Sequence, residues 1–147
     1  MRYCGLTNDT EVVLMNALAH DAAVANSRDD LNGMHVLIVE DAWDIGIGLK
    51  ELLEARGANV AGPVATCADA RRLLFEGIPD VALVDINLRR GELSFDLIER
   101  LDHEGVRVVV ITGYDDVSLE PGKVAAIVQK PIGEDRLLAA LLPAMVA

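Results

Sequence analysis

The sequence predicts an α/β domain in which a five-stranded parallel sheet carries helices on both faces, the doubly wound arrangement. Short apolar runs recur along the chain, and segments of helical periodicity separate them. In the clearest run, Val81–Asp85, four apolar residues without alternation lead into an aspartate, which is typical of a strand covered on both faces. Strands that alternate with helices favour parallel pairing through right-handed crossovers.

Four further runs complete the predicted sheet. They are short and rich in Val, Ile, Leu and Ala, and turn residues bound them. Gly62-Pro63 is expected to end the second strand, because proline cannot donate a ladder hydrogen bond. The predicted strands are 35–39, 59–61, 81–85, 107–111 and 125–128.

Helical spacing of apolar residues predicts a helix after every strand except the fourth. Ile45, Leu49, Leu52 and Leu53 share one face of the first helix, and Gly57 is a natural stop. Thr66 and Ser94 suit the starts of the next two helices. The polar segment 115–123 has room for at most two helical turns, and Leu137, Leu138, Leu141 and Leu142 mark the last helix before Pro143.

Residues 1–33 are interpreted as an N-terminal extension, and residues 34–147 as the domain itself. Asn8 and Glu11 have the spacing of a capping box, and an apolar helical face follows them before a polar linker. That face would cover either the domain or a second subunit, so a monomer and a homodimer both stay open. A misassigned start, with the true domain beginning near Met34, is the alternative.

Composition narrows the class of protein. The chain has 147 residues, enough for one domain, with 52% hydrophobic and 25% charged residues, as in soluble globular proteins. A net charge of −11 argues against nucleic acid as a partner. Cys4 and Cys67 form no metal or redox motif, which fits free thiols and a cytoplasmic protein. Neither a signal peptide nor an apolar run long enough to cross a membrane is evident.

Polar residues stand at the carboxyl ends of four predicted strands, where open α/β sheets place their ligands. They are Glu40, Asp41, Asp85, Thr112 and Lys130. Three clustered carboxylates repel one another unless a cation neutralises them, and oxygen ligands of this kind suit Mg²⁺. A lysine and a hydroxyl beside them can hold the oxygens of an incoming anion. The set is therefore suited to a phosphoryl group that one carboxylate attacks.

In this order and on these strands, the motifs resemble the receiver domain of two-component response regulators, over residues 34–147. The resemblance implies the flavodoxin-like (CheY-like) fold with strand order 2-1-3-4-5. It also implies that Asp85 accepts a phosphoryl group from a kinase phosphohistidine. Asp41, Asp85 and the backbone carbonyl of Asn87 would coordinate Mg²⁺, and Glu40 would hold a metal-bound water.

The same resemblance assigns the phosphoryl-binding and switch residues. Lys130 would contact a phosphoryl oxygen, followed by a cis bond to Pro131, and Thr112 would be the switch hydroxyl. Receivers usually carry an aromatic residue where this chain has Ile127, so the usual aromatic switch is in doubt. Tyr114 would then modulate the site by shielding it, or would simply pack.

The stretch Val-Ile-Thr-Gly-Tyr, with the short interval between Thr112 and Lys130, resembles the atypical single-domain "FATGUY" receivers. That resemblance implies a short or irregular fourth helix and histidine kinases of the HWE/HisKA-2 type as partners. A histidine phosphotransfer protein is the other expected donor. Partner surfaces are expected on the first helix (Ile45, Ile47, Leu49) with Pro131-Ile132, and on the 113–124 loop with the fifth strand.

The first hypothesis is therefore a stand-alone receiver, which signals through protein contacts or phosphorelay and has no enzymatic output beyond its own phosphotransfer and dephosphorylation. A phosphohydrolase that forms an aspartyl-phosphate, of the HAD-like type, is the enzyme alternative. It would need an acid/base carboxylate two positions after the nucleophile, where Asn87 stands. The third hypothesis is a degenerate receiver that serves as a dimerisation scaffold.

Overall fold

The computed structural model describes residues 30–113 and 124–142, and they form a parallel sheet of five strands. The sheet order is β3-β2-β4-β5-β6, which is 2-1-3-4-5 when the strands are counted along the chain, as predicted. Each neighbouring pair of strands is parallel. The strands are β2 (His35–Val39), β3 (Asn59–Val64), β4 (Val81–Asp85), β5 (Arg107–Thr112) and β6 (Ala126–Gln129).

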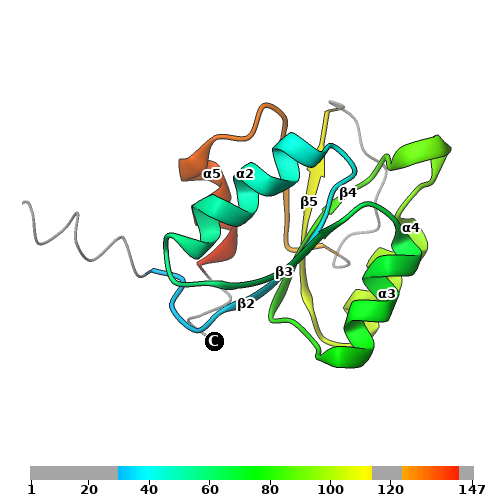
Figure 1. The fold of residues 1–147 in the computed structure, drawn as a ribbon, viewed down its shortest axis with the longest axis horizontal. Helices are drawn as coiled ribbons and strands as arrows, with labels where there is room; N and C mark the ends of the chain where they lie inside the picture. The colour runs from blue at the N-terminus through cyan, green and yellow to red at the C-terminus, as the bar shows by residue number, and fades with distance from the viewer. Residues whose placement is uncertain (1–29, 114–123, 143–147) are drawn as a thin grey trace, which may run out of the picture.

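Four α-helices within the described residues cover the sheet on both faces. Helices α2 and α5 lie on one face, and α3 and α4 lie on the other (Figure 1). This arrangement confirms the doubly wound fold class. The helices are α2 (Trp43–Glu54), α3 (Cys67–Glu76), α4 (Phe95–His103) and α5 (Glu134–Leu141), and a short 3-10 turn, η1 (Arg89–Gly91), precedes α4.

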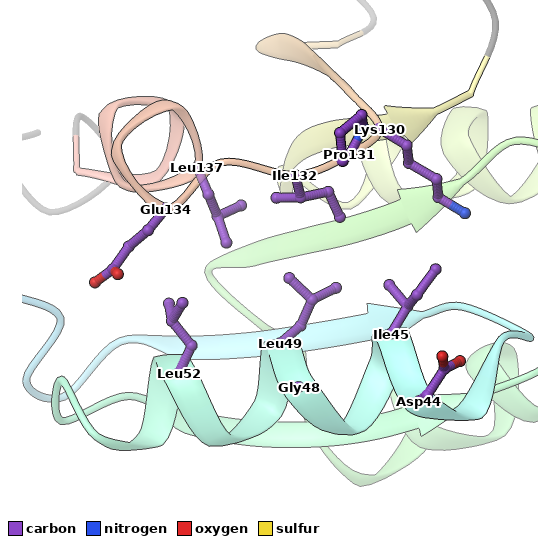
Figure 2. Close-up of a pocket in the computed structure, with 10 residues that line it drawn as sticks. All are labelled: Asp44, Ile45, Gly48, Leu49, Leu52, Lys130, Pro131, Ile132, Glu134 and Leu137. Carbon is purple, nitrogen blue, oxygen red and sulfur yellow. The ribbon is translucent and has the colours of Figure 1, made fainter.

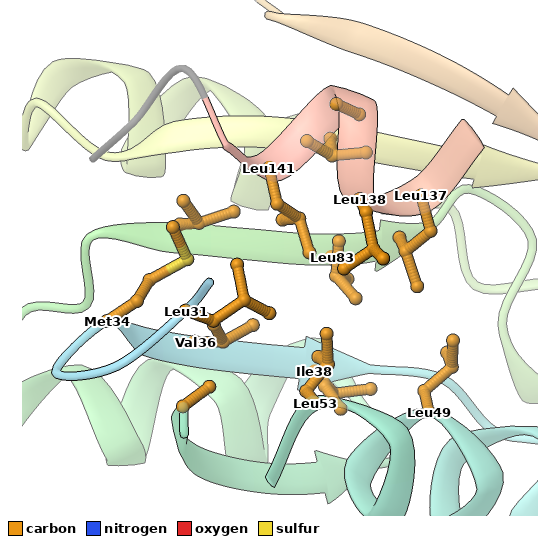
Figure 3. Packing of buried hydrophobic residues seen from close by; sticks show 14 of the residues in the cluster. Leu31, Met34, Val36, Ile38, Leu49, Leu53, Leu83, Leu137, Leu138 and Leu141 are labelled. Atoms are coloured by element: carbon orange, nitrogen blue, oxygen red, sulfur yellow. The ribbon is translucent and has the colours of Figure 1, made fainter. Parts of the chain in front are cut away.

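Alternation along the strands divides the core into two apolar layers. Val36 and Ile38 of β2 face α2 and α5, while Leu37 and Val39 face α3 and α4. Figure 3 shows the first layer, where leucines from the two helices pack on β2 and β4. Every residue of β4 is buried, as its unbroken apolar run predicts. The central strand is therefore fixed on both sides and holds its last residue, Asp85, at a defined place.

The prediction that β3 ends at Ala61 is wrong, because the strand continues through Gly62-Pro63 to Val64. Proline is tolerated there because β3 is an edge strand, and the pairing with β2 shifts register beside it. Gly62 has a φ of 96°, and a Cβ on it would stand 2.6 Å from the carbonyl oxygen of Ile38. Only glycine fits this position.

The fifth strand begins and ends one residue later than predicted, at Ala126 and Gln129. The expected N-terminal helix, the 115–123 segment and Pro143 lie outside the described residues. The described chain already contributes to the core before Met34, since Leu31 is fully buried against α2 and α5. The packed unit therefore includes residues that the sequence analysis placed in the extension.

The contact of α2 with β3 yields a stability prediction. A Cβ on Gly46 would stand 2.7 Å from Cβ of Pro63, so Gly46→Ala must push the helix and the strand apart. We expect it to lower the free energy of unfolding by about 1–3 kcal/mol. Gly48 lies in the same helix with nothing within 4 Å of its added Cβ, so Gly48→Ala should raise stability by up to about 1 kcal/mol. Urea unfolding checks both, and equal effects would contradict the close-contact argument.

Candidate functional site

The carboxyl edge of the sheet brings the predicted acidic residues together. Glu40 and Asp41 follow β2, and Asp85 is the last residue of the neighbouring strand β4. One carboxylate oxygen from each of the three lies within 4.8 Å of the others. Glu40 and Asp85 are buried, and Asp41 is half-buried. The three side chains thus form one compact cluster, as strand adjacency requires.

Lys130 supplies the positive charge of this cluster. Its backbone N–H donates to the carbonyl of Thr112 (2.8 Å), so β5 positions the lysine. Its Nζ donates to Oδ2 of Asp85 (3.0 Å) and lies 3.1 Å from Oε1 of Glu40. The sequence analysis assigned this ammonium to an incoming anion. In the structure it already pairs with two carboxylates.

Burial and ion pairing act in opposite directions on the lysine. Burial lowers the pKa of Lys130, but the attraction of the Asp85 and Glu40 carboxylates outweighs burial, so the pKa is raised above its ordinary value. The ammonium therefore stays charged at neutral pH. It is a permanent cation on the sheet edge, available to an anionic group that approaches Asp85.

Glu40 is the most perturbed acid of the site. Burial, with the neighbouring Asp85 carboxylate, raises the pKa of Glu40 to about 7. Its Oε2 accepts a hydrogen bond from the backbone N–H of Ala42 (3.2 Å). Its Oε1 is buried and, although close to Lys130, accepts no hydrogen bond within the described structure. This oxygen is ion-paired with Lys130 but lacks an aligned hydrogen-bond donor, so it can still accept a hydrogen bond from a further ligand.

These residues fit a divalent cation such as the Mg²⁺ that the resemblance to receiver domains implies. When all three carboxylates are ionised, the cluster and the Lys130 ammonium carry a formal net charge of −2, which a divalent ion would balance. The donors are all oxygens, as hard cations prefer. Oε1 of Glu40, ion-paired with Lys130 but without an aligned hydrogen-bond donor, adds an acceptor for a water on the metal. The chemistry of the donor set and the unsatisfied atom point to the same kind of occupant.

The loop after β4 orients the Asp85 side chain. The backbone N–H of Asn87 donates to Oδ1 of Asp85 (3.2 Å), so each oxygen of this carboxylate has a donor. Asn87 itself is exposed, and its backbone lies directly beside the acidic cluster. Ser94 also belongs to this site, because its buried hydroxyl donates to the carbonyl oxygen of Asp85 (2.8 Å). The sequence pattern indicated Ser94 only as the start of a helix, and no local signal pointed to this contact.

The remaining predicted residues lie as follows. Thr112 is buried at the end of β5, next to the site through its bond to Lys130. The Lys130–Pro131 peptide bond is cis. Ile127, where receivers usually have an aromatic residue, is 48% exposed on β6. Tyr114 lies outside the described residues.

The fold and this edge define the class of protein: a receiver-type α/β domain with an acid cluster and a lysine at one end of its sheet. The family model of the response regulator receiver domain matches residues 36–142. The chain therefore belongs to the response regulator receiver family, as the resemblance predicted. Its assignment to the FATGUY subtype stays a prediction.

Solved structures of receivers resemble the chain. The PhyR receiver domain of Erythrobacter litoralis is 28% identical, with a TM-score of 0.68 over 79% of this chain and 92% of that one. PhyR of Brucella abortus is 25% identical, with a TM-score of 0.69 over 86% of this chain and 53% of the other. The chain thus matches about half the length of the Brucella protein. The receiver domain of a modulated diguanylate cyclase from Desulfovibrio desulfuricans G20 is 26% identical, with a TM-score of 0.64 over 77% of this chain and 94% of that one.

No curated protein matched the sequence. Among the helices of residues 30–113 and 124–142, none has the length and apolar character needed to span a bilayer.

The raised pKa of Glu40 predicts how stability changes with pH. Between about pH 4.5 and 7 the folded protein binds a proton that the unfolded chain has released. In magnesium-free buffer the free energy of unfolding should therefore fall as pH rises through this range, by at most about 1.4 kcal/mol per pH unit. Glu40→Gln should remove this fall, whereas Glu51→Gln, on the exposed side of α2, should leave it. Denaturant unfolding from pH 5 to 7.5 checks this, and an unchanged slope in Glu40→Gln would contradict it.

Proposed function

We propose that this receiver domain accepts a phosphoryl group on Asp85 in a Mg²⁺-dependent reaction and passes the signal on through protein contacts or phosphorelay. One observation carries the proposal. The Asp85 carboxylate lies at the carboxyl end of the central strand, between two further acids and a lysine ammonium 3.0 Å away. This arrangement combines a nucleophile with charges that can hold a phosphoryl group.

In the proposed reaction, an Asp85 oxygen attacks the phosphorus of a phosphohistidine. The new O–P bond forms as the N–P bond breaks, and the electron pair of that bond returns to the imidazole of the donor. Lys130 would turn part of its hydrogen bonding from the carboxylates to a phosphoryl oxygen. Its charge, which the site keeps at neutral pH, favours that oxygen as negative charge accumulates.

Asp41, Asp85 and the backbone carbonyl of Asn87 would hold the metal directly, and Glu40 would hold it through a water. The ion, when bound, would neutralise carboxylates and phosphoryl oxygens together. The buried Thr112 hydroxyl, at the end of β5, is the group we assign to the switch. Because Ile127 stands where receivers usually carry an inward-turning aromatic residue, we propose that a movement of Thr112 would instead rearrange the loop that follows it.

The alternatives lack this support. A phosphohydrolase of the HAD-like type needs an acid/base group two positions after the nucleophile, and the amide of Asn87 cannot transfer a proton in that way. A degenerate scaffold would not require a buried acceptor, a charged lysine and a buried carboxylate oxygen without a hydrogen-bond donor at one strand edge. Phosphotransfer accounts for all three.

The proposed donor is a histidine kinase, of the HWE/HisKA-2 type, or a histidine phosphotransfer protein. A groove of about 310 Å³ lies between α2 and the segment from Lys130 into α5 (Figure 2). Figure 2 shows Lys130 at one end of the groove, beside Ile45 and Asp44. A helix of the donor that lies in the groove would therefore reach Asp85. The lining is mainly apolar, as a helix-binding groove requires, and includes Ile45, Leu49, Leu52, Ile132 and Leu137.

The predicted contact surface needs one correction. Leu49 is 6% exposed and belongs to the core, so it forms the floor of the groove and not a free contact. Ile45 and Ile132 are half-buried. Trp43, in contrast, is 69% exposed at the start of α2, two residues after Asp41. An exposed tryptophan two residues from an acid of the cluster is the side chain that we assign to donor contact.

Replacing the acceptor tests the proposal. Asp85→Asn should lose all detectable transfer from an autophosphorylated HWE/HisKA-2 kinase in the presence of Mg²⁺, because an amide cannot form the acyl phosphate. Circular dichroism should show that the fold survives. Asp96→Asn, at an exposed position of α4, is the matched control and should be phosphorylated like the original protein. Label that persists on Asp85→Asn would exclude Asp85 as acceptor.

The exposed aromatic residues test the docking surface separately from the chemistry. Trp43→Ala should slow transfer from the kinase by about fivefold or more, in the range of an interface hot spot. It should leave phosphorylation by acetyl phosphate unchanged. Phe75 is 84% exposed on α3, on the opposite face of the sheet, so Phe75→Ala should change neither rate. Equal slowing with both donors would instead place Trp43 in the chemistry of the site.

A further inference from the structure

The hydroxyl of Ser94 lies in an unusual place for a helix-start residue. Ser94 precedes α4, but its side chain makes no capping hydrogen bond to that helix. The residue is fully buried, with 0% exposure. Its Oγ donates to the carbonyl of Asp85 at 2.8 Å and lies 3.4 Å from the carbonyl of Ile86. The hydroxyl thus serves the acceptor strand and not the helix.

Ser94 also closes the loop that follows the acceptor. Its backbone N–H donates to the carbonyl of Ile86 (3.1 Å). One step further along the loop, Asn87 and Leu93 form an antiparallel bridge. The N–H of Leu88 donates to the carbonyl of Glu92 (2.8 Å). Backbone contacts therefore close the loop from Ile86 to Ser94, and Ser94 makes the contact nearest to Asp85.

This closed loop presents two backbone groups to the acidic cluster. One is the carbonyl of Asn87, and the other is the N–H of Asn87, which holds Oδ1 of Asp85. Both depend on the backbone path from Asp85 through Ile86. The Ser94 hydroxyl fixes that path at its first peptide unit. In a buried place, no water can replace a lost donor without a cavity for it.

We propose that Ser94 is a positioning residue for phosphotransfer: it holds the Asp85 backbone so that the Asp85 carboxylate and the Asn87 carbonyl converge on one cation. This inference rests on the proposed function, and it assigns Ser94 a role through other residues. Groups that orient metal ligands from behind typically change metal affinity by about 10–100-fold when removed.

The test compares two hydroxyl deletions. Ser94→Ala removes the donor to Asp85, whereas Thr66→Ala removes a hydroxyl that accepts from the N–H of Asp69 and caps α3. Both lose one hydrogen bond, but only Ser94 is joined to the acceptor. Ser94→Cys keeps the shape with a weak S–H donor and should show a smaller change, which serves if Ser94→Ala does not fold.

Two readouts are needed. The first is the Mg²⁺ dissociation constant, measured by the fluorescence of Trp43 without any phosphodonor. We expect Ser94→Ala to raise it about tenfold and Thr66→Ala to leave it within about twofold. The second is hydrogen exchange of the amides of Asn87 and Leu88, which needs no metal. In Ser94→Ala these amides should exchange about tenfold faster or more, relative to the global rate.

Each outcome decides a different claim. A Mg²⁺ constant and loop exchange in Ser94→Ala that match those of Thr66→Ala would overturn the positioning role. The proposed function fails separately if the original protein takes up neither Mg²⁺ nor a phosphoryl group. Hydrogen exchange alone then decides whether Ser94 fixes the Asp85 loop: faster local exchange supports it, and unchanged exchange overturns it.

Discussion

The contact between Lys130 and the two buried acids is the interaction on which the site depends. Without the ammonium, Glu40 and Asp85 would be two buried carboxylates next to Asp41, and no positive charge in the cluster would offset their mutual repulsion. The lysine offsets part of this charge, so the cluster keeps a formal charge of −2 when all three carboxylates are ionised. Burial, with the neighbouring Asp85 carboxylate, raises the pKa of Glu40, so the lysine does not fully offset the cost of ionising this buried acid.

The sheet explains why these groups meet at all. Apolar layers on both faces fix the parallel strands, so residues at their carboxyl ends share one edge. The groove of Figure 2 runs along α2 and ends at Lys130, so the proposed docking groove is continuous with the charged edge of the sheet. Trp43 stands exposed at that end of the helix. The proposed docking groove and the acidic cluster therefore lie at the same edge of the domain, where α2 and the segment from Lys130 into α5 meet.

Much of this was predictable from sequence because the determinants are local. The runs at β2 and β4 are unbroken and apolar, and their ends carry the acids, so strand adjacency alone brings Glu40, Asp41 and Asp85 together. Three-dimensional contacts were not predictable in this way. The Lys130 ammonium pairs with Glu40 and Asp85, whereas the sequence indicated only a contact with an incoming anion. The Ser94 hydroxyl donates to the Asp85 carbonyl and does not cap α4. The helical spacing of Leu49 places it on the inner face of α2, and it packs in the core and not on the partner surface where it was expected.

The passage of β3 through Gly62-Pro63 has a consequence for how the molecule behaves in solution. This strand is an outer edge of the sheet, where free N–H and C=O groups invite another chain to pair. Pro63 offers no N–H, and the irregular register beside it spoils the straight template that a foreign strand would need. The Gly62-Pro63 dipeptide therefore disfavours edge-to-edge pairing with a second chain, as in a fibril. Gly46 at the same time allows α2 to pack closely on Pro63.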